Sequence, residues 1–280
     1  MQISAIIPSF NRRHCLERAL QSVVEQSSPA EEIILIDDGS SDGSSEWARQ
    51  RYPEVKIIRQ QNLGVSAARN RGISQAQHDW IAFLDSDDSW HRNKLERIRQ
   101  AQLQSPDYVL YHSDEIWVRK GVRVNPMDKH RKQGGWIFDH CLALCAISPS
   151  TVVMRKDILL SLGMFDETLP ACEDYDLWLR LCHRYPVHFS EQALVTRYAG
   201  HEDQLSQQYW GMDRFRIRAL ANLLGRHKLS PDAREASRQM LLRKLKILLN
   251  GAHKRGNQAV VDEFTPLLSA WRDDLEPGRC

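Results

Sequence analysis

The chain has 280 residues, 42% hydrophobic and 26% charged, with a net charge of +2. These are ordinary globular values, and the length fits one large α/β domain or a domain of about 200 residues with an appendage. The six cysteines show no Cys-x-x-Cys pair and no zinc spacing, and the longest run without charged residues, 140–154, is too short to cross a bilayer. Because Met1 leads directly into a predicted strand, with no signal peptide, we expect a cytoplasmic protein with reduced thiols and no nucleic-acid partner.

The charge is unevenly distributed along the chain. Residues 1–204 contain 24 Lys and Arg against 28 Asp and Glu, whereas residues 205–280 contain 14 against 8. This change in character predicts two parts: an α/β domain over residues 1–206 and a helical C-terminal extension over residues 207–280.

Strand and helix patterns alternate over the first hundred residues. Short apolar runs predict buried strands at 3–8, 33–36, 55–58 and 80–84. Helical patterns fall between them, ending near Gln26, in a short segment before the third strand, and at 64–76. Such alternation predicts a mostly parallel sheet with right-handed crossovers, flanked by helices.

Carboxylates follow two of these strands at the point where each strand ends. Asp37 and Asp38 follow the second strand, and Asp85, Asp87 and Asp88 follow the fourth. Parallel strands end at the same edge of a sheet, where ligands bind in open α/β folds. Clustered carboxylates repel one another unless a cation lies among them, and Mg²⁺ or Mn²⁺ is often held by one or two carboxylates plus substrate phosphates.

This pattern therefore predicts a metal–diphosphate site built on Asp85 and Asp87, with Asp88 in support. The alternative is a strand-to-helix turn whose Asp and Ser side chains cap the helix that begins near Asn93.

The middle of the chain predicts a strand, a hairpin and a polar loop. The strand is expected at 108–111, and the hairpin pairs 116–118 with 122–124. Residues 125–135 are polar and basic, as in a mobile loop that could close over a site or simply be solvated. A short helix at 137–143 and a strand at 151–154 follow, and we expect acceptor contacts from residues 125–150.

A helix beginning near Glu173 carries a second group of carboxylates. Apolar residues recur at helical spacing and should face the core: Leu177, Trp178 and Leu181. Asp176 and Arg180 are four apart and predict a surface ion pair worth a few tenths of a kcal/mol. Asp174 falls on the inner side at the helix N-terminus, where the dipole favours its ionised form, as a general base requires. Alternatively, Glu173 and Asp174 merely complement the helix dipole.

The C-terminal segment predicts basic amphipathic helices. Residues 214–255 contain 12 Lys and Arg against only Asp232 and Glu235. The apolar face of one helix comprises Met240, Leu241, Leu245, Leu248, Leu249 and Ala252. Such a face packs on its own domain or on a sister subunit of a homo-oligomer. Alternatively, it makes a peripheral contact with the anionic inner face of a membrane.

Taken in order, several segments resemble a family 2 glycosyltransferase of the GT-A fold. The resemblance spans roughly residues 1–206 and rests on motifs at 6–11, 36–42, 62–70, 83–88, 163–166, 173–178 and 197–201. It implies a GT-A type, Rossmann-like, mostly parallel sheet flanked by helices, and the helical C-terminal segment is then an appendage to it.

The resemblance also implies roles for individual residues. Those expected around the nucleotide sugar are Pro8, Ser9, Phe10, Asp38, Arg69 and Asp85, with Arg69 at the pyrophosphate, where a guanidinium suits phosphate. Asp87 would bind the Mn²⁺ or Mg²⁺ cofactor, Asp174 resembles the catalytic base, and His201 is a further metal or diphosphate contact or an ordinary surface histidine.

The implied activity is transfer of a sugar, with inversion, from a nucleotide-diphosphate donor to an acceptor hydroxyl. The donor would be a UDP-sugar, with GDP and dTDP not excluded, and the acceptor a glycan or a lipid-linked molecule in polysaccharide, glycolipid or cell-envelope glycan synthesis. Two other functions stay open. One is a sugar-1-phosphate nucleotidyltransferase, which shares this layout but has a Gly- and Arg-rich loop after its first strand. The other is a non-catalytic sugar-nucleotide binder or scaffold, which would lack the base or the metal ligand.

Overall fold

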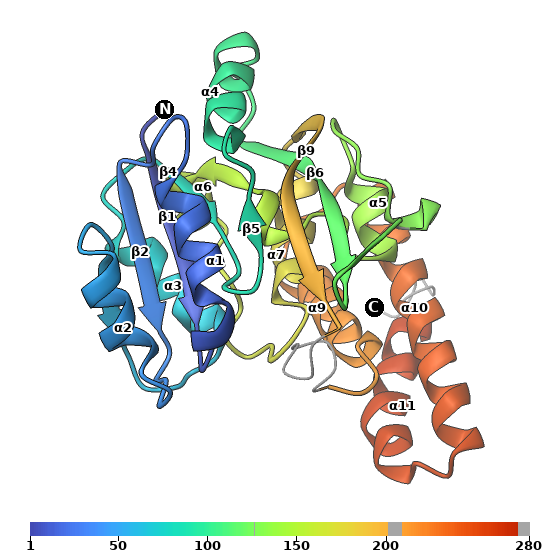
Figure 1. Ribbon diagram of the computed structural model, residues 1–280. Coiled ribbons are helices and arrows are strands. Elements are labelled where there is room, and N and C mark those ends of the chain that lie inside the picture. Colours follow the sequence, from blue (N-terminus) through green and yellow to red (C-terminus); the bar gives the residue numbers. More distant parts are fainter. Residues whose placement is uncertain (126, 201–208, 274–280) are drawn as a thin grey trace.

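A mixed sheet runs through the centre of the computed structural model, which describes residues 1–125, 127–200 and 209–273 (Figure 1). Its strand order is β3-β2-β1-β4-β8-β6-β9-β5, with β7 paired to β6. The strands are β1 (Ile3–Ser9), β2 (Glu32–Asp37), β3 (Lys56–Arg59), β4 (Trp80–Phe83), β5 (Ser89–Trp90), β6 (Leu110–Arg119), β7 (Val122–Val124), β8 (Val153–Arg155) and β9 (His188–Ala199).

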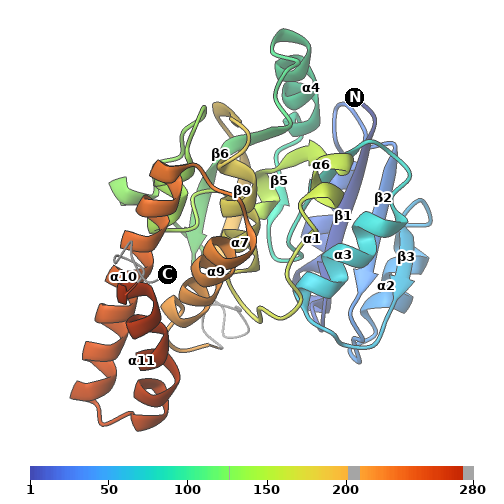
Figure 2. The ribbon, with the colours of Figure 1, turned by 180° about the vertical axis from the view of Figure 1, so that it is seen from behind.

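Helices cover both faces of this sheet, as the two opposite views show (Figures 1 and 2). One face carries α1 (Arg13–Val24), α2 (Ser44–Arg51) and α4 (Lys94–Gln104). The helices that pack against the other face are α3 (Val65–Gln75), α5 (Phe138–Ala143), α6 (Lys156–Ser161), α7 (Glu173–Cys182), α9 (Asp213–Arg226), α10 (Pro231–Lys254) and α11 (Gln258–Asp273).

Residues of β1 and β2 divide between these two cores because successive side chains of a strand point to opposite faces. Ile3, Ala5 and Ile7 pack with α1, whereas Ile6 packs with α3. A strand covered on both faces needs apolar residues at consecutive positions, which is why these strands read as continuous apolar runs.

The predicted parallel arrangement is found in the first half of the sheet. β1 pairs in parallel with β2 and β4, and β2 pairs in parallel with β3. The short strand β8 then runs antiparallel to both β4 and β6, and β6 pairs in parallel with β9. Consequently β1, β2, β4, β6 and β9 all point the same way, and their carboxyl ends lie at one edge of the sheet.

One strand was expected as two. Residues 110–119 form a single strand, β6, rather than separate strands at 108–111 and 116–118. Its register with β9 shifts on both sides of Asp114, so the apolar pattern breaks there although the pairing continues.

The expected surface ion pair on α7 is buried, so that prediction is wrong. Arg180 Nε donates to Asp176 Oδ2 at 2.8 Å, Nη2 donates to the Met164 carbonyl at 2.7 Å, and Nη1 donates to the Leu162 carbonyl. Asp176 and Arg180 are only 3% and 6% exposed. The i,i+4 spacing correctly predicted that the two residues form an ion pair, but residues 156–165 pack over the pair and bury it.

The C-terminal helices pack against the α/β domain. The apolar residues of α10 join the same core as Ile6 of β1 and Phe83 of β4: Leu241, Leu245, Leu248, Leu249 and Ala252. The apolar face of α10 therefore packs within its own chain, as one of the two alternatives predicted, and membrane contact would have to rely on other surfaces. None of the helices in the described parts of the chain is both long and apolar enough to cross a membrane.

Candidate active site

The turn after β4 presents two of its three carboxylates to solvent. The side chains of Asp85 and Asp87 are 28% and 20% exposed. Asp88 is buried, where it accepts hydrogen bonds from Ser150 Oγ at 2.6 Å and from the main-chain N–H of Tyr198 at 3.2 Å. Burial, and then the charge of Asp87, raises the pKa of Asp88 well above its usual value. Asp88 thus holds the turn against β9, and Asp85 and Asp87 are the carboxylates able to meet a ligand.

These two carboxylates fit a hard divalent cation that shares its coordination with water and substrate phosphates. Among the described residues no group of three or more His, Cys, Asp or Glu side chains is arranged to hold a metal alone. His201, the other predicted ligand, lies outside the described residues.

Arg69 of α3 lies between two carboxylates. Its Nη2 donates to Asp85 Oδ1 and its Nη1 to Glu173 Oε1, both at 2.6 Å. Burial by itself would lower the pKa of Arg69, but the charges of Asp85 and Glu173 raise it above its usual value. Both terminal nitrogens therefore have protein partners, and in this arrangement Arg69 positions Asp85 and α7.

Asp174 lies at the start of α7, next to this bridge. Cys172, the residue before the helix, has a left-handed backbone with φ of 62°. For a residue with a Cβ such a conformation costs energy, and strained residues of this kind cluster at functional sites. Glu173 is buried against Arg69, whereas Asp174 is half-buried and accepts a hydrogen bond from the Tyr175 N–H at 2.7 Å. At the start of α7, therefore, the carboxylate of Glu173 is buried and that of Asp174 is partly exposed.

The residues predicted for the nucleotide lie at the same edge. Pro8 and Ser9 end β1 with buried side chains, and the ring of Phe10 is 44% exposed just beyond it. Asp38 follows β2, and its carboxylate is held by the segment between β3 and α3. The carboxylate accepts hydrogen bonds from Gln60 Nε2 at 2.8 Å and from the N–H groups of Leu63 and Gly64 at 3.0 and 2.8 Å. Asp38 therefore holds the segment that leads into α3.

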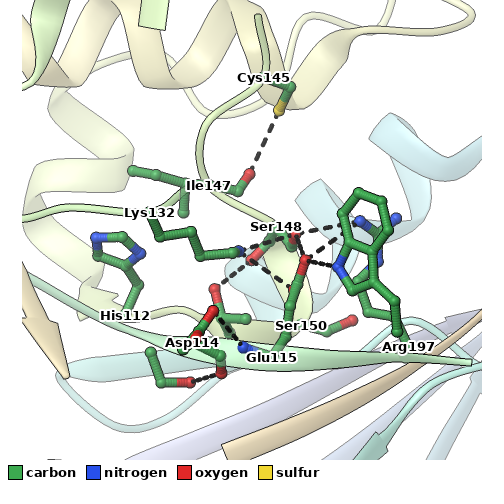
Figure 3. A network of polar contacts seen from close by, with 12 residues as sticks. His112, Asp114, Glu115, Lys132, Cys145, Ile147, Ser148, Ser150 and Arg197 are labelled. Atoms are coloured by element: carbon green, nitrogen blue, oxygen red, sulfur yellow. Dashed lines mark hydrogen bonds and ion pairs between the residues drawn. The ribbon is translucent and has the colours of Figure 1, made fainter. Parts of the chain in front are cut away.

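A buried polar network, which the sequence did not predict, supports the turn on the β6–β9 side (Figure 3). Glu115 Oε1 accepts hydrogen bonds from Trp117 Nε1 at 2.7 Å and Ser148 Oγ at 3.0 Å. Lys132 Nζ lies 3.2 Å from Glu115 Oε2, and Arg197 Nη1 lies 3.5 Å from Oε1. Burial alone would raise the pKa of Glu115, but the charges of Lys132 and Arg197 lower it to about 2.

Arg197 connects this network to the carboxylate turn, which Ser150 also holds. The Ser150 hydroxyl accepts a hydrogen bond from the Asp85 N–H at 3.1 Å and donates to Asp88. Arg197 Nε lies 3.9 Å from Asp88 Oδ2, so Arg197 reaches both acidic residues. The end of the 125–135 segment, expected as a mobile loop, is held here by its buried Lys132.

The chain is similar to several known glycosyltransferases. The sequence model of glycosyl transferase family 2 matches residues 4–156. The putative teichuronic acid biosynthesis glycosyltransferase TuaG of Bacillus subtilis is 26% identical over 215 residues, which cover 74% of this chain and 82% of TuaG. The amylovoran biosynthesis glycosyltransferase AmsB of Erwinia amylovora is 28% identical over 195 residues, 64% of each protein.

Coverage differs among the relatives. The match to an uncharacterized glycosyltransferase of Rickettsia conorii covers 69% of this chain but only 33% of that protein. Among solved structures, S. aureus TarS 1-349 in complex with UDP-GlcNAc superposes with a TM-score of 0.70 at 19% identity, covering 89% of this chain and 73% of TarS 1-349. This likeness shows the expected GT-A fold. Since the family match spans more than half of the chain, this protein belongs to glycosyl transferase family 2.

Proposed function

We propose that this protein transfers a sugar from a UDP-sugar to an acceptor hydroxyl, with inversion, in the synthesis of a polysaccharide or cell-envelope glycan. One observation carries the proposal. Arg69 joins Asp85, in the partly exposed carboxylate turn, to Glu173, the neighbour of Asp174, with two hydrogen bonds of 2.6 Å. One diphosphate-side carboxylate and the helix that carries the candidate base are thereby fixed relative to each other, as positioned catalysis requires.

The relatives support the same class of reaction. TuaG and AmsB are named as glycosyltransferases of teichuronic acid and amylovoran biosynthesis, and TarS was solved with UDP-GlcNAc. UDP is therefore the first donor nucleotide to test.

In the proposed reaction the acceptor oxygen attacks the anomeric carbon while the bond from that carbon to the diphosphate oxygen breaks. The electron pair of the broken bond leaves with UDP, and Asp174 takes the proton of the acceptor hydroxyl. A single displacement of this kind inverts the anomeric configuration.

The diphosphate end is assigned to the carboxylate turn. Asp85 and Asp87 would hold Mn²⁺ or Mg²⁺, which when bound neutralises charge on the diphosphate. Arg69 keeps Asp85 and Glu173 in place and so sets the distance between the turn and α7.

Product analysis tests this proposal. The protein is incubated with UDP-glucose, UDP-galactose and UDP-GlcNAc and a mixture of acceptors, UDP release is followed, and the new linkage is assigned by NMR. A β-linked product from an α-linked donor is expected. An α-linked product would contradict inversion. UDP binding without turnover of any of the three donors would favour the non-catalytic binder, and formation of nucleotide sugar from UTP and sugar 1-phosphate would favour the nucleotidyltransferase.

A further inference from the structure

Helix α1 carries a polar row beside the apolar face that packs on the sheet. Arg18, Ser22 and Gln26 follow one another at intervals of four residues, the spacing that places side chains on one side of a helix. Arg18 Nη2 donates to the Asp87 carbonyl at 2.6 Å, and Ser22 Oγ accepts from the Trp90 N–H at 3.0 Å. Gln26, just beyond the helix, donates at 2.8 Å to the carbonyl of the residue after Trp90. The chain from Asp87 onward therefore lies along α1, as Figure 1 shows for β5.

The guanidinium of Arg18 also contacts the end of β9. Its central carbon lies 3.6 Å from the centre of the Tyr198 ring, a close cation–π contact. The main-chain N–H of Tyr198 in turn donates to Asp88 at 3.2 Å. Arg18 therefore joins three parts of the fold at one point: α1, the carboxylate turn and the end of β9.

Within the carboxylate turn, Arg18 holds a residue that the other contacts of the turn do not reach directly. Ser150 holds the two flanking residues, because its hydroxyl accepts from the Asp85 N–H at 3.1 Å and donates to Asp88 at 2.6 Å. The main chain of Asp87 lies between them, and its carbonyl accepts the hydrogen bond from Arg18. This bond comes from a charged donor and is partly buried, two conditions that strengthen a hydrogen bond.

A fixed carbonyl restricts the direction of the side chain on the same residue, because both are attached to the same Cα through short, stiff bonds. The Asp87 carboxylate is 20% exposed, and Arg12 Nη1 lies 3.9 Å from its Oδ2. Arg12 thus attracts the carboxylate from the side, whereas Arg18 holds the backbone that carries it. Arg18 is therefore placed to control where the Asp87 carboxylate points.

We infer that Arg18 is a positioning residue for the diphosphate end of the site. By holding the main chain of Asp87 against α1 and β9, it keeps the carboxylate in the orientation that binds a divalent cation. Such ligands work only when held to within about 0.5 Å of their productive geometry, and residues behind them supply that precision. The inference rests on the proposed function, since the metal–diphosphate site is part of it.

Two substitutions of Arg18 separate its hydrogen bond from its bulk. Arg18→Met keeps an unbranched stem but removes the donor and the charge, and Arg18→Lys is the conservative variant that can still donate to the carbonyl. Arg13→Met is the matched control, because Arg13 lies on the same helix and stacks in the same way, 3.7 Å from the centre of a ring, on Trp47 of α2.

Two titrations follow binding without relying on turnover. UDP is titrated by calorimetry into each protein with saturating Mn²⁺ and again with EDTA. Mn²⁺ is then titrated into each protein at saturating UDP, and its binding is followed by the relaxation of water protons. Arg18→Met is also combined with Asp87→Asn, and urea denaturation of every variant reports whether it is folded.

We expect Arg18→Met to weaken the binding of UDP in Mn²⁺, and of Mn²⁺ itself, by about threefold or more, as for directly coupled neighbours. Arg18→Lys should recover part of this loss, and Arg13→Met should bind as the wild type does. UDP binding in EDTA should not change. In the Asp87→Asn protein, Arg18→Met should have no further effect, because the carboxylate through which Arg18 acts is already absent.

Four results would overturn the inference. Mn²⁺-dependent binding could be unchanged in Arg18→Met, or Arg13→Met could show the same loss. A further loss when Arg18→Met is added to Asp87→Asn, or weaker UDP binding in EDTA, would place Arg18 at the diphosphate itself. If Arg18→Met does not fold, the same comparisons are made with Arg18→Lys, whose smaller loss must likewise vanish in Asp87→Asn. Wild-type protein that binds no UDP in Mn²⁺ would instead reject the proposed metal–diphosphate site, and with it any role of Arg18 there.

Discussion

Arg69 and Glu173 lie 104 residues apart in the sequence and meet in a hydrogen bond of 2.6 Å, with both side chains buried. Through this contact α3 is fixed to α7, which carries Asp174. Because Arg69 also donates to Asp85, the carboxylate turn and the start of α7 are thereby held relative to each other.

Replacing Glu173 with Gln keeps the shape of the side chain but leaves the buried Arg69 with one charged partner fewer. We expect the free energy of unfolding to fall by about 1–3 kcal/mol, the cost of weakening a buried charged hydrogen bond. Urea denaturation measures this change. The matched control is Asp157→Asn, which weakens the exposed pair with Arg155 and should cost under about 0.5 kcal/mol. Equal effects of the two substitutions would show that the Arg69–Glu173 bond is not a buried one.

Asp174→Asn removes the proposed base with almost no change of volume. Turnover should fall by about 10²–10⁴-fold, the usual contribution of general base catalysis, while the affinity for UDP stays the same. Transfer rates and UDP titrations of the variant test this, with Asp107→Asn on the surface as control. If turnover of the variant stays within about threefold of the wild-type value, another group accepts the proton.

Arg180→Met tests the burial of the ion pair on α7. The substitution leaves the Asp176 carboxylate and the carbonyls of Leu162 and Met164 without their donor. A loss of about 3–5 kcal/mol is expected, as for other buried pairs deprived of one partner. A loss of only a few tenths of a kcal/mol, measured by thermal or urea unfolding, would support the surface pair expected from sequence.

Lys94 makes stability depend on pH. It is fully buried at the start of α4, donates to the Thr151 carbonyl at 3.1 Å, and lies over the ring of Trp90. Burial, and then the charge of Lys132, lowers its pKa to about 7 from the usual 10.5. Between these two values the unfolded chain binds the proton and the folded chain does not, so this group makes folding more favourable as pH rises.

The difference between wild type and Lys94→Met isolates this contribution. From pH 7 to pH 10 the wild-type free energy of unfolding should gain up to about 1 kcal/mol per pH unit relative to the variant. Urea denaturation at several pH values measures it, and parallel curves for the two proteins would show that Lys94 stays protonated in the fold.

The sequence predicts the framework of this site well because its strands are buried on both faces. Continuous apolar runs located β1, β2 and β4, and the carboxylates at their ends located the turn with Asp85 and Asp87. The spacing of apolar residues along a single strand or helix is enough for such predictions, because it needs no information about the rest of the fold.

The supporting contacts could not be predicted in the same way. Glu115, Lys132, Ser148 and Arg197 come from four separate segments, and no local pattern marks their meeting. The burial of the Asp176–Arg180 pair likewise depends on a segment that precedes α7 and packs over it. Such contacts follow from tertiary packing, whereas spacing along one helix specifies only that the two residues are neighbours.

We propose that Asp87 lies at a metal-dependent site for a nucleoside diphosphate. Calorimetric titration with UDP, GDP and dTDP, each with Mn²⁺ and again with EDTA, tests it on wild type and Asp87→Asn, with Asp107→Asn as control. We expect UDP to bind with Mn²⁺, EDTA to remove most of the affinity, and only Asp87→Asn to weaken binding by about tenfold or more, the equivalent of one charged contact. UDP binding of the same strength with EDTA, or in Asp87→Asn, would show that Asp87 does not hold a metal needed for UDP binding.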